Sequence, residues 1–105
     1  MSGKLHQREA KKLLDSDGSI ILLDVRNPNE YNLAHIPGSI LIPLSKLEDD
    51  VEDKIEDKNA KIFVYCKSGS RSATASRMLA TMGYKNIFDI GGIDSWPYEK
   101  EQGIK

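Results

Sequence analysis

The sequence predicts an α/β fold in which a parallel sheet is covered by helices on both faces. Two apolar runs, 20–25 and 62–65, show almost no polar alternation, which is typical of strands buried on both faces of a parallel sheet. Segments with helical spacing of apolar residues alternate with these strands. A chain of alternating strands and helices favours parallel pairing over hairpins.

The length and composition fit one globular domain over residues 1–105. A net charge of −1 gives no electrostatic reason to expect binding to nucleic acid or to a membrane surface. The single cysteine has no partner for an internal disulfide, and with two histidines it forms no recognisable zinc pattern, so no metal or cofactor is expected. The chain shows no apolar leader or membrane-spanning run, which makes the cytoplasm the expected location.

The first third of the chain should form a helix, a strand and a second, short helix. Apolar residues within 5–14 recur on one face of a surface helix, and the strand 20–25 follows a turn. The next helix begins with a capping box, in which Asn27 and Glu30 satisfy each other's backbone amides and Pro28 takes the first helical position.

Two polar groups in this region have a structural and a catalytic interpretation. Asp24 and Arg26 lie at the carboxyl end of their strand, where an ion pair that ties loops together is favoured over a catalytic role. His35 has no acid or second ligand beside it in the sequence. It is therefore interpreted as fastening the turn at Pro37 and Gly38 rather than acting as a general base.

Further along, a third strand is expected over 39–42, and Ser45 with Glu48 fits a second capping box. The last strand is expected over 87–90, where the following Gly91 and Gly92 suggest a close approach of two backbone segments. A short final helix is expected to begin at 95–97, with Trp96 in the core.

Residues 62–83 contain the only cysteine and the strongest functional signal. The strand ends at Cys66, and a helix with apolar residues at helical spacing ends at Gly83. Small or basic residues lie between them: Lys67, Ser68, Gly69, Ser70, Arg71 and Ser72. Ligands of open α/β sheets bind beyond the carboxyl ends of strands, so this order of strand, thiol, loop and helix marks Cys66 as a candidate reactive residue.

The expected surroundings of Cys66 favour its thiolate. The first N–H groups of a helix have no partner inside the helix, and the macrodipole adds partial positive charge there. Lys67 and Arg71 add two cations, and such surroundings stabilise a thiolate. Small residues at 68–70 allow several amides to point at one centre, so the loop is expected to bind a charged sulfur species.

The alternative is that Cys66 is a small apolar residue at the end of a buried strand. A structural cysteine would not need neighbours rich in Gly, Ser, Lys and Arg. The reactive interpretation is therefore favoured, and Cys66 is expected at a strand end that faces solvent.

Three segments, LLDVRNPNEYNLAHIPGSILIPL, YCKSGSRS and GGIDSW, together resemble a single-domain rhodanese, a sulfurtransferase, over about Leu5 to Trp96. The resemblance implies a rhodanese-like α/β fold with a five-stranded parallel sheet and helices on both faces. It also implies that Cys66 forms a persulfide and that its active-site loop comprises residues 67–71. Those residues are Lys67, Ser68, Gly69, Ser70 and Arg71, of which the last closes the loop.

The implied reaction takes sulfane sulfur from a small donor such as thiosulfate onto Cys66 and passes it to cyanide or a thiol. With one cysteine in the chain, the acceptor thiol comes from another molecule, and a protein acceptor is possible.

Two other functions are compatible with the pattern. Rhodanese-fold phosphatases and arsenate reductases resemble this chain, but they place five residues between the cysteine and the arginine, where this chain has four. The second is a non-enzymatic rhodanese-like module for interaction or regulation, because a retained motif does not prove a reaction.

Overall fold

The computed structural model describes residues 2–103, which form five strands and four α-helices. The strands are β1 (Gly3–Lys4), β2 (Ile21–Asp24), β3 (Ile40–Leu41), β4 (Lys61–Cys66) and β5 (Asn86–Gly92). The helices are α1 (Gln7–Ser16), α2 (Pro28–Leu33), α3 (Leu47–Lys54) and α4 (Ser70–Thr81), with short 3-10 helices η1 (Leu44–Lys46) and η2 (Ile93–Ser95). No helix in this part of the chain is long and apolar enough to cross a membrane.

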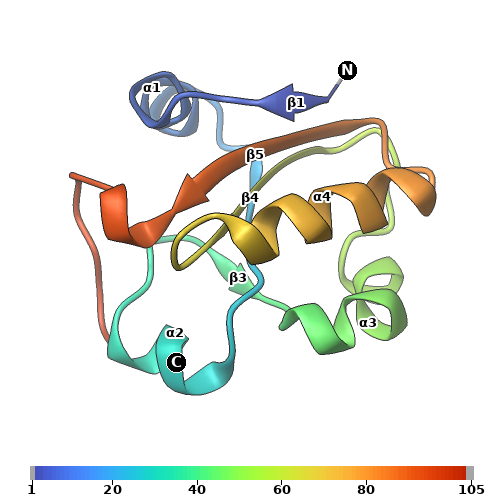
Figure 1. The fold of residues 1–105 in the computed structure, drawn as a ribbon. Helices are drawn as coiled ribbons and strands as arrows, with labels where there is room; N and C mark the ends of the chain where they lie inside the picture. The colour runs from blue at the N-terminus through green and yellow to red at the C-terminus, as the bar shows by residue number, and fades with distance from the viewer. Residues whose placement is uncertain (1, 104–105) are drawn as a thin grey trace.

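All five strands pair in parallel, in the order β1-β5-β4-β2-β3, which confirms the predicted sheet (Figure 1). The apolar strand β4 lies at the centre, as expected for a strand without polar alternation. β1 has only two residues, Gly3 and Lys4, which pair with Phe88 and Asp89 of β5. So short a strand carries no periodic signal, which explains why sequence patterning does not locate it.

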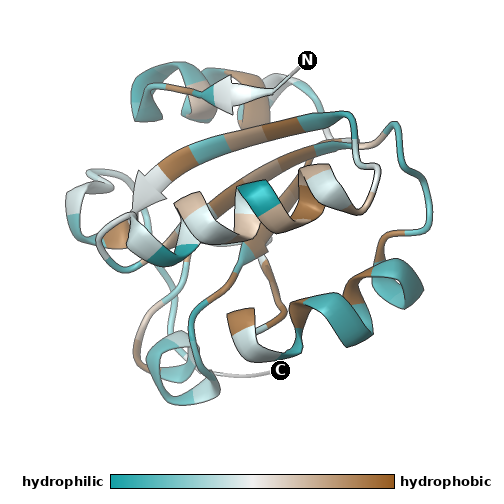
Figure 2. Ribbon diagram, turned by 45° about the vertical axis from the view of Figure 1, so that its right-hand side comes forward, coloured by the Kyte–Doolittle hydropathy of each residue, from teal (hydrophilic) through white to brown (hydrophobic). Residues whose placement is uncertain are grey.

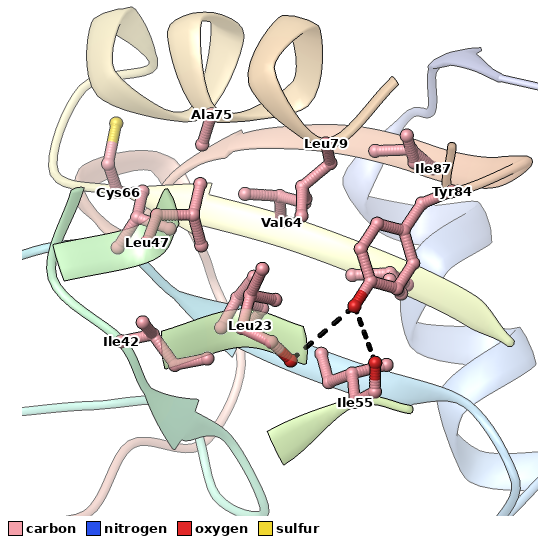
Figure 3. Packing of buried hydrophobic residues seen from close by; sticks show 13 residues of the cluster. Leu23, Ile42, Leu47, Ile55, Val64, Cys66, Ala75, Leu79, Tyr84 and Ile87 are labelled. Carbon is pink, nitrogen blue, oxygen red and sulfur yellow. Dashed lines mark hydrogen bonds between the residues drawn. The ribbon is translucent and has the colours of Figure 1, made fainter. Parts of the chain in front are cut away.

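Two buried clusters cover the two faces of the sheet. On one face α3 and α4 pack against β2 and β4, and the apolar strands run beneath more polar helices (Figure 2). On the other face α1 and the segment after β5 contribute Ala10, Ile93 and Trp96 to a second cluster. Figure 3 shows Cys66 at one end of the first cluster, near Ala75 of α4. The core therefore extends up to the candidate reactive residue.

The two predicted capping boxes have different outcomes. Asn27 accepts from the amide of Glu30, whose side chain in turn accepts from the amide of Asn27, so the first capping box is confirmed. The second is wrong, because Ser45 lies inside η1 and α3 begins at Leu47 without a side-chain cap. The Leu44 amide donates to the Val25 carbonyl and Leu47 is fully buried, so tertiary contacts set this helix start.

The segment after β5 also differs from the expectation. The final turn is the 3-10 helix η2, which ends at Ser95, so the short helix expected to begin at 95–97 is wrong. Trp96 is extended because Pro97 disfavours helical geometry in the residue before it. Its side chain is 2% exposed, which confirms the predicted core position.

Candidate active site

Cys66 is the last residue of β4 and lies opposite Gly92 in the neighbouring strand. A change of register between Val64 and Cys66 marks this end of the pairing. Cys66 is completely buried, so the prediction of a solvent-facing strand end is wrong. The following turn and the start of α4 fold back over the sulfur and contact it through Gly69 and Ser72.

The loop after Cys66 is shorter than the sequence suggests. Gly69 takes a φ of +112°, a left-handed conformation that suits glycine, and it serves as the N-cap of α4. Ser70 and Arg71 therefore belong to the first turn of the helix, and Lys67, Ser68 and Gly69 form the loop. The amide of Gly69 donates to the Cys66 Sγ at 3.0 Å, which directs a helix N-terminus at the sulfur.

Both the side chain and the backbone of Lys67 contact the segment that follows β5. Its side chain is 59% exposed, and its Nζ lies 2.9 Å from an oxygen of Asp94. The backbone repeats this connection, because the Asp94 amide donates to the Lys67 carbonyl at 3.0 Å. The positive charge of Lys67 is therefore paired with the carboxylate of Asp94.

Arg71 forms a two-pronged ion pair with Glu30 of α2. Its two terminal nitrogens donate to the two Glu30 oxygens at 2.7 and 2.8 Å. These bonds, opposed by partial burial, lower the pKa of Glu30 to about 2 and raise the pKa of Arg71, to which the charge of Cys66 also contributes. The pair links α4 to α2 beside the loop.

Glu30→Gln is expected to destabilise the protein at neutral pH and to have a much smaller effect in acid. Glutamine retains the capping bond to Asn27 but loses the ionic attraction to Arg71. The pKa of Glu30 is lowered from 4.5 to about 2, so its stabilisation is complete above about pH 4.5 and is lost as the pH falls toward 2. Urea unfolding of both proteins at several pH values measures this difference, and a difference that is constant down to the acid end would contradict the ion-pair account.

The structural interpretations of the Asp24–Arg26 pair and of His35 have different outcomes. Arg26 donates to both oxygens of the buried Asp24 at 2.7 to 3.0 Å, which confirms the ion pair. His35 is structural, but it does not fasten the Pro37–Gly38 turn as predicted. Its ring contacts the Tyr31 carbonyl at 2.9 Å and Glu101 at 3.2 Å, and it stacks on Tyr31. The partner at the far end of the chain is invisible to local sequence reasoning.

Two hollows flank the loop. One, of about 360 Å³, is lined by Lys67, by residues of α2 and by the chain after β5, which includes the cation Lys100. Arg26, between β2 and α2, adds another cation to this lining. The other, of about 620 Å³, is lined by Ser68, Gly69 and Asp89. Small molecules can therefore approach the loop from two sides.

Sequence reasoning assigned no role to Ser72, which lies beside the sulfur, or to Asp89, which Ser72 contacts. The Oγ of Ser72 lies 3.6 Å from the Cys66 Sγ and 2.8 Å from Oδ1 of Asp89. Ser72 is fully buried and Asp89 is 8% exposed. The available signal was Asp89 itself, a charged residue within the apolar run Ile87–Ile90.

Comparison with known proteins identifies relatives of this chain. Residues 6–99 match the family model of the rhodanese-like domain. The thiosulfate sulfurtransferase PspE of Escherichia coli is 35% identical over 81 residues, which cover 77% of this chain and 78% of PspE. YrkF of Bacillus subtilis, whose name describes a sulfur carrier protein, is 38% identical over 92 residues, and the chain spans only 49% of its length.

Solved structures agree with the sequence relatives. A rhodanese from E. coli determined with anions superposes with a TM-score of 0.75 at 33% identity and covers 80% of this chain and 99% of its own. The Alr3790 protein of Anabaena superposes with a TM-score of 0.88 at 25% identity, covering 95% and 81%. The family model, the sequence relatives and the superposed structures agree, and the chain belongs to the rhodanese-like sulfurtransferase family.

Proposed function

We propose that this protein is a thiosulfate sulfurtransferase that carries sulfane sulfur as a persulfide on Cys66. The observation that carries the proposal is the bond from the Gly69 amide to the Cys66 Sγ, at the carboxyl end of the central strand. Membership of the sulfurtransferase family and the similarity to PspE support the same chemistry. The active-site loop comprises Lys67, Ser68 and Gly69, followed by Ser70 and Arg71 in the first helical turn.

The proposed reaction has two steps. The Cys66 thiolate attacks the outer sulfur of thiosulfate, a sulfur–sulfur bond forms, and sulfite leaves with the electron pair of the broken bond. The amide of Gly69 and the N-terminus of α4 stabilise the negative sulfur without rearranging. Cyanide or a thiol of another molecule then removes the outer sulfur and regenerates the thiolate, which gives ping-pong kinetics.

Intact mass after incubation with thiosulfate tests the proposal directly. The expected result is a one-sulfur increase that disappears when cyanide is added, with formation of thiocyanate. A protein that binds partners but acquires no sulfur would instead be the non-enzymatic module.

The same preparation is expected to show no hydrolysis of p-nitrophenyl phosphate. Four residues separate Cys66 from Arg71, and the direction of each amide follows from the backbone angles of its neighbours, so this cradle is too tight for a phosphate. Inserting one glycine after Ser68 should widen the cradle and reduce persulfide formation, because the donors then lie beyond about 3.1 Å from the anion. Phosphatase activity in the unmodified protein that is lost in Cys66→Ser would favour the phosphatase alternative.

A further inference from the structure

A chain of three side chains begins at the reacting sulfur and ends at a carboxylate. The Cys66 thiol lies in position to donate to the Ser72 Oγ at 3.6 Å, and that hydroxyl donates to Asp89 Oδ1 at 2.8 Å. The Gly91 amide donates to the same carboxylate oxygen at 2.9 Å. Cys66 and Ser72 are fully buried, so no bulk water competes for these bonds.

The single hydroxyl proton of Ser72 decides in which direction the hydrogen bonds among these three side chains run. Its hydroxyl has one proton, and its oxygen neighbours are all acceptors: Asp89 at 2.8 Å, the Gly69 carbonyl at 3.0 Å and the Gly91 carbonyl at 3.4 Å. The Asp89 carboxylate is the nearest of these acceptors and the only charged one, so it accepts the hydrogen bond from the Ser72 hydroxyl. The Ser72 oxygen is then left to accept from the Cys66 thiol.

We propose that Ser72 and Asp89 form a proton relay that activates Cys66, with Ser72 as a catalytic residue and Asp89 as the acceptor that positions it. This inference rests on the proposed function for its biological role. The relay itself removes a proton from the Cys66 thiol, so it can be tested without a sulfur donor.

The step balances without another reactant. The S–H bond of Cys66 breaks and its proton passes to the Ser72 oxygen, while the proton of Ser72 passes to Asp89 Oδ1. The electron pair remains on sulfur and becomes the nucleophile, and the negative charge moves from the carboxylate to the thiolate. Afterwards the Ser72 hydroxyl donates to the sulfur, because the protonated Asp89 now donates to Ser72.

The relay has an outlet. Asp89 lines the hollow of about 620 Å³ on the side of the loop where β1 ends and α1 begins, so its proton can leave toward solvent. The other charged or titratable groups lining the same hollow are Lys4, His6, Arg8 and Tyr98. From β4 and α4, Asp89 is faced by Cys66 through Ser72, while Arg71 is engaged with Glu30.

The test compares Asp89→Asn and Ser72→Ala with the unmodified protein. Asparagine can accept the same hydrogen bonds from Ser72 and Gly91, but it does not take up a proton. Ser72→Ala removes the link between thiol and carboxylate. The matched controls are Asp53→Asn, on the exposed face of α3, and Ser76→Ala, one turn further along α4.

Two rates are measured from about pH 6 to about pH 10, a range that spans the ordinary ionisation of cysteine. They are persulfide formation from thiosulfate, by rapid quench and mass, and alkylation of Cys66 by iodoacetamide, which needs no sulfur chemistry. Both variants should react about 100-fold more slowly at the acid end, and the difference should vanish at the alkaline end, where solvent has already removed the proton.

Two other outcomes would overturn the relay, and a third would separate it from the proposed function. Asp89→Asn that reacts faster near neutral pH would mean that the carboxylate acts only as a repulsive charge toward the thiolate and the dianionic donor. An equal loss at every pH would mean a structural role for both residues. If the alkylation rates follow the expected pattern but thiosulfate never loads the unmodified protein, the relay stands and the proposed function fails.

Discussion

Cys66→Ala is expected to abolish sulfur transfer completely while leaving a folded protein. The side chain is the only thiol in the chain, so no other group can form the persulfide. The substitution also removes a buried atom from the first core cluster. That loss should cost about 1 kcal/mol, near the centre of measured single substitutions.

Thiocyanate formation and thermal unfolding are measured on the same samples. We expect no turnover above the uncatalysed rate and a decrease in Tm of about 4–8 °C for a domain of this size. Turnover equal to that of the unmodified protein would remove Cys66 from the mechanism. Complete unfolding would show that Cys66 acts chiefly as a core residue.

The sequence predicts the parts of this fold that depend on local patterns. Continuous apolar runs identify β2 and β4, and the capping box at Asn27 identifies the start of α2. The position of Cys66 between a buried strand and a helix is likewise local information. Each of these features depends on residues within a few positions of one another.

The remaining features depend on how the topology joins distant segments. Glu30 and Arg71 are 41 positions apart, and their ion pair exists because α2 and α4 meet beside the same loop. Ser72 and Asp89 are 17 positions apart, and they meet because α4 packs on β5. Neither pair leaves a periodic signal, so the relay beside Cys66 becomes visible only in three dimensions.

The burial of Cys66 illustrates the same distinction. The residue types around it predict several amides directed at the sulfur, and among the described residues the Gly69 amide donates to it. They do not indicate how closely that loop packs, because this depends on the neighbouring strand β5. The close backbone approach suggested by Gly91 and Gly92 is confirmed at Gly92, which lies opposite Cys66.

Gly92→Ala is therefore expected to disrupt the active-site loop. The backbone of Gly92 is ordinary extended strand, with φ −121° and ψ 152°, so alanine meets no conformational barrier there. The obstacle is space, because a Cβ at this position would lie 2.2 Å from the Lys67 carbonyl oxygen and 2.6 Å from the Ser68 Cα. Both contacts are with backbone, which cannot rotate away as a side chain can.

The loop must move to admit the methyl group, and its movement has two consequences. The bond from the Asp94 amide to the Lys67 carbonyl is strained or lost, and the Gly69 amide no longer lies 3.0 Å from the sulfur. Overpacking of this kind costs about 1–3 kcal/mol of stability, while loss of one preorganised donor to the reacting anion costs about 100-fold or more in rate. The effect on persulfide formation should therefore exceed the effect on folding.

Gly18→Ala is the matched control, since a Cβ there meets no atom within 4 Å. Both variants are compared by urea unfolding and by the rate at which thiosulfate adds one sulfur to Cys66. We expect Gly18→Ala to behave like the unmodified protein in the loading assay and Gly92→Ala to remain folded but load at least about 100-fold more slowly. Loading of Gly92→Ala at the normal rate would show that the contact between β5 and the loop does not position the Gly69 amide, and the proposed basis of persulfide stabilisation would have to be abandoned.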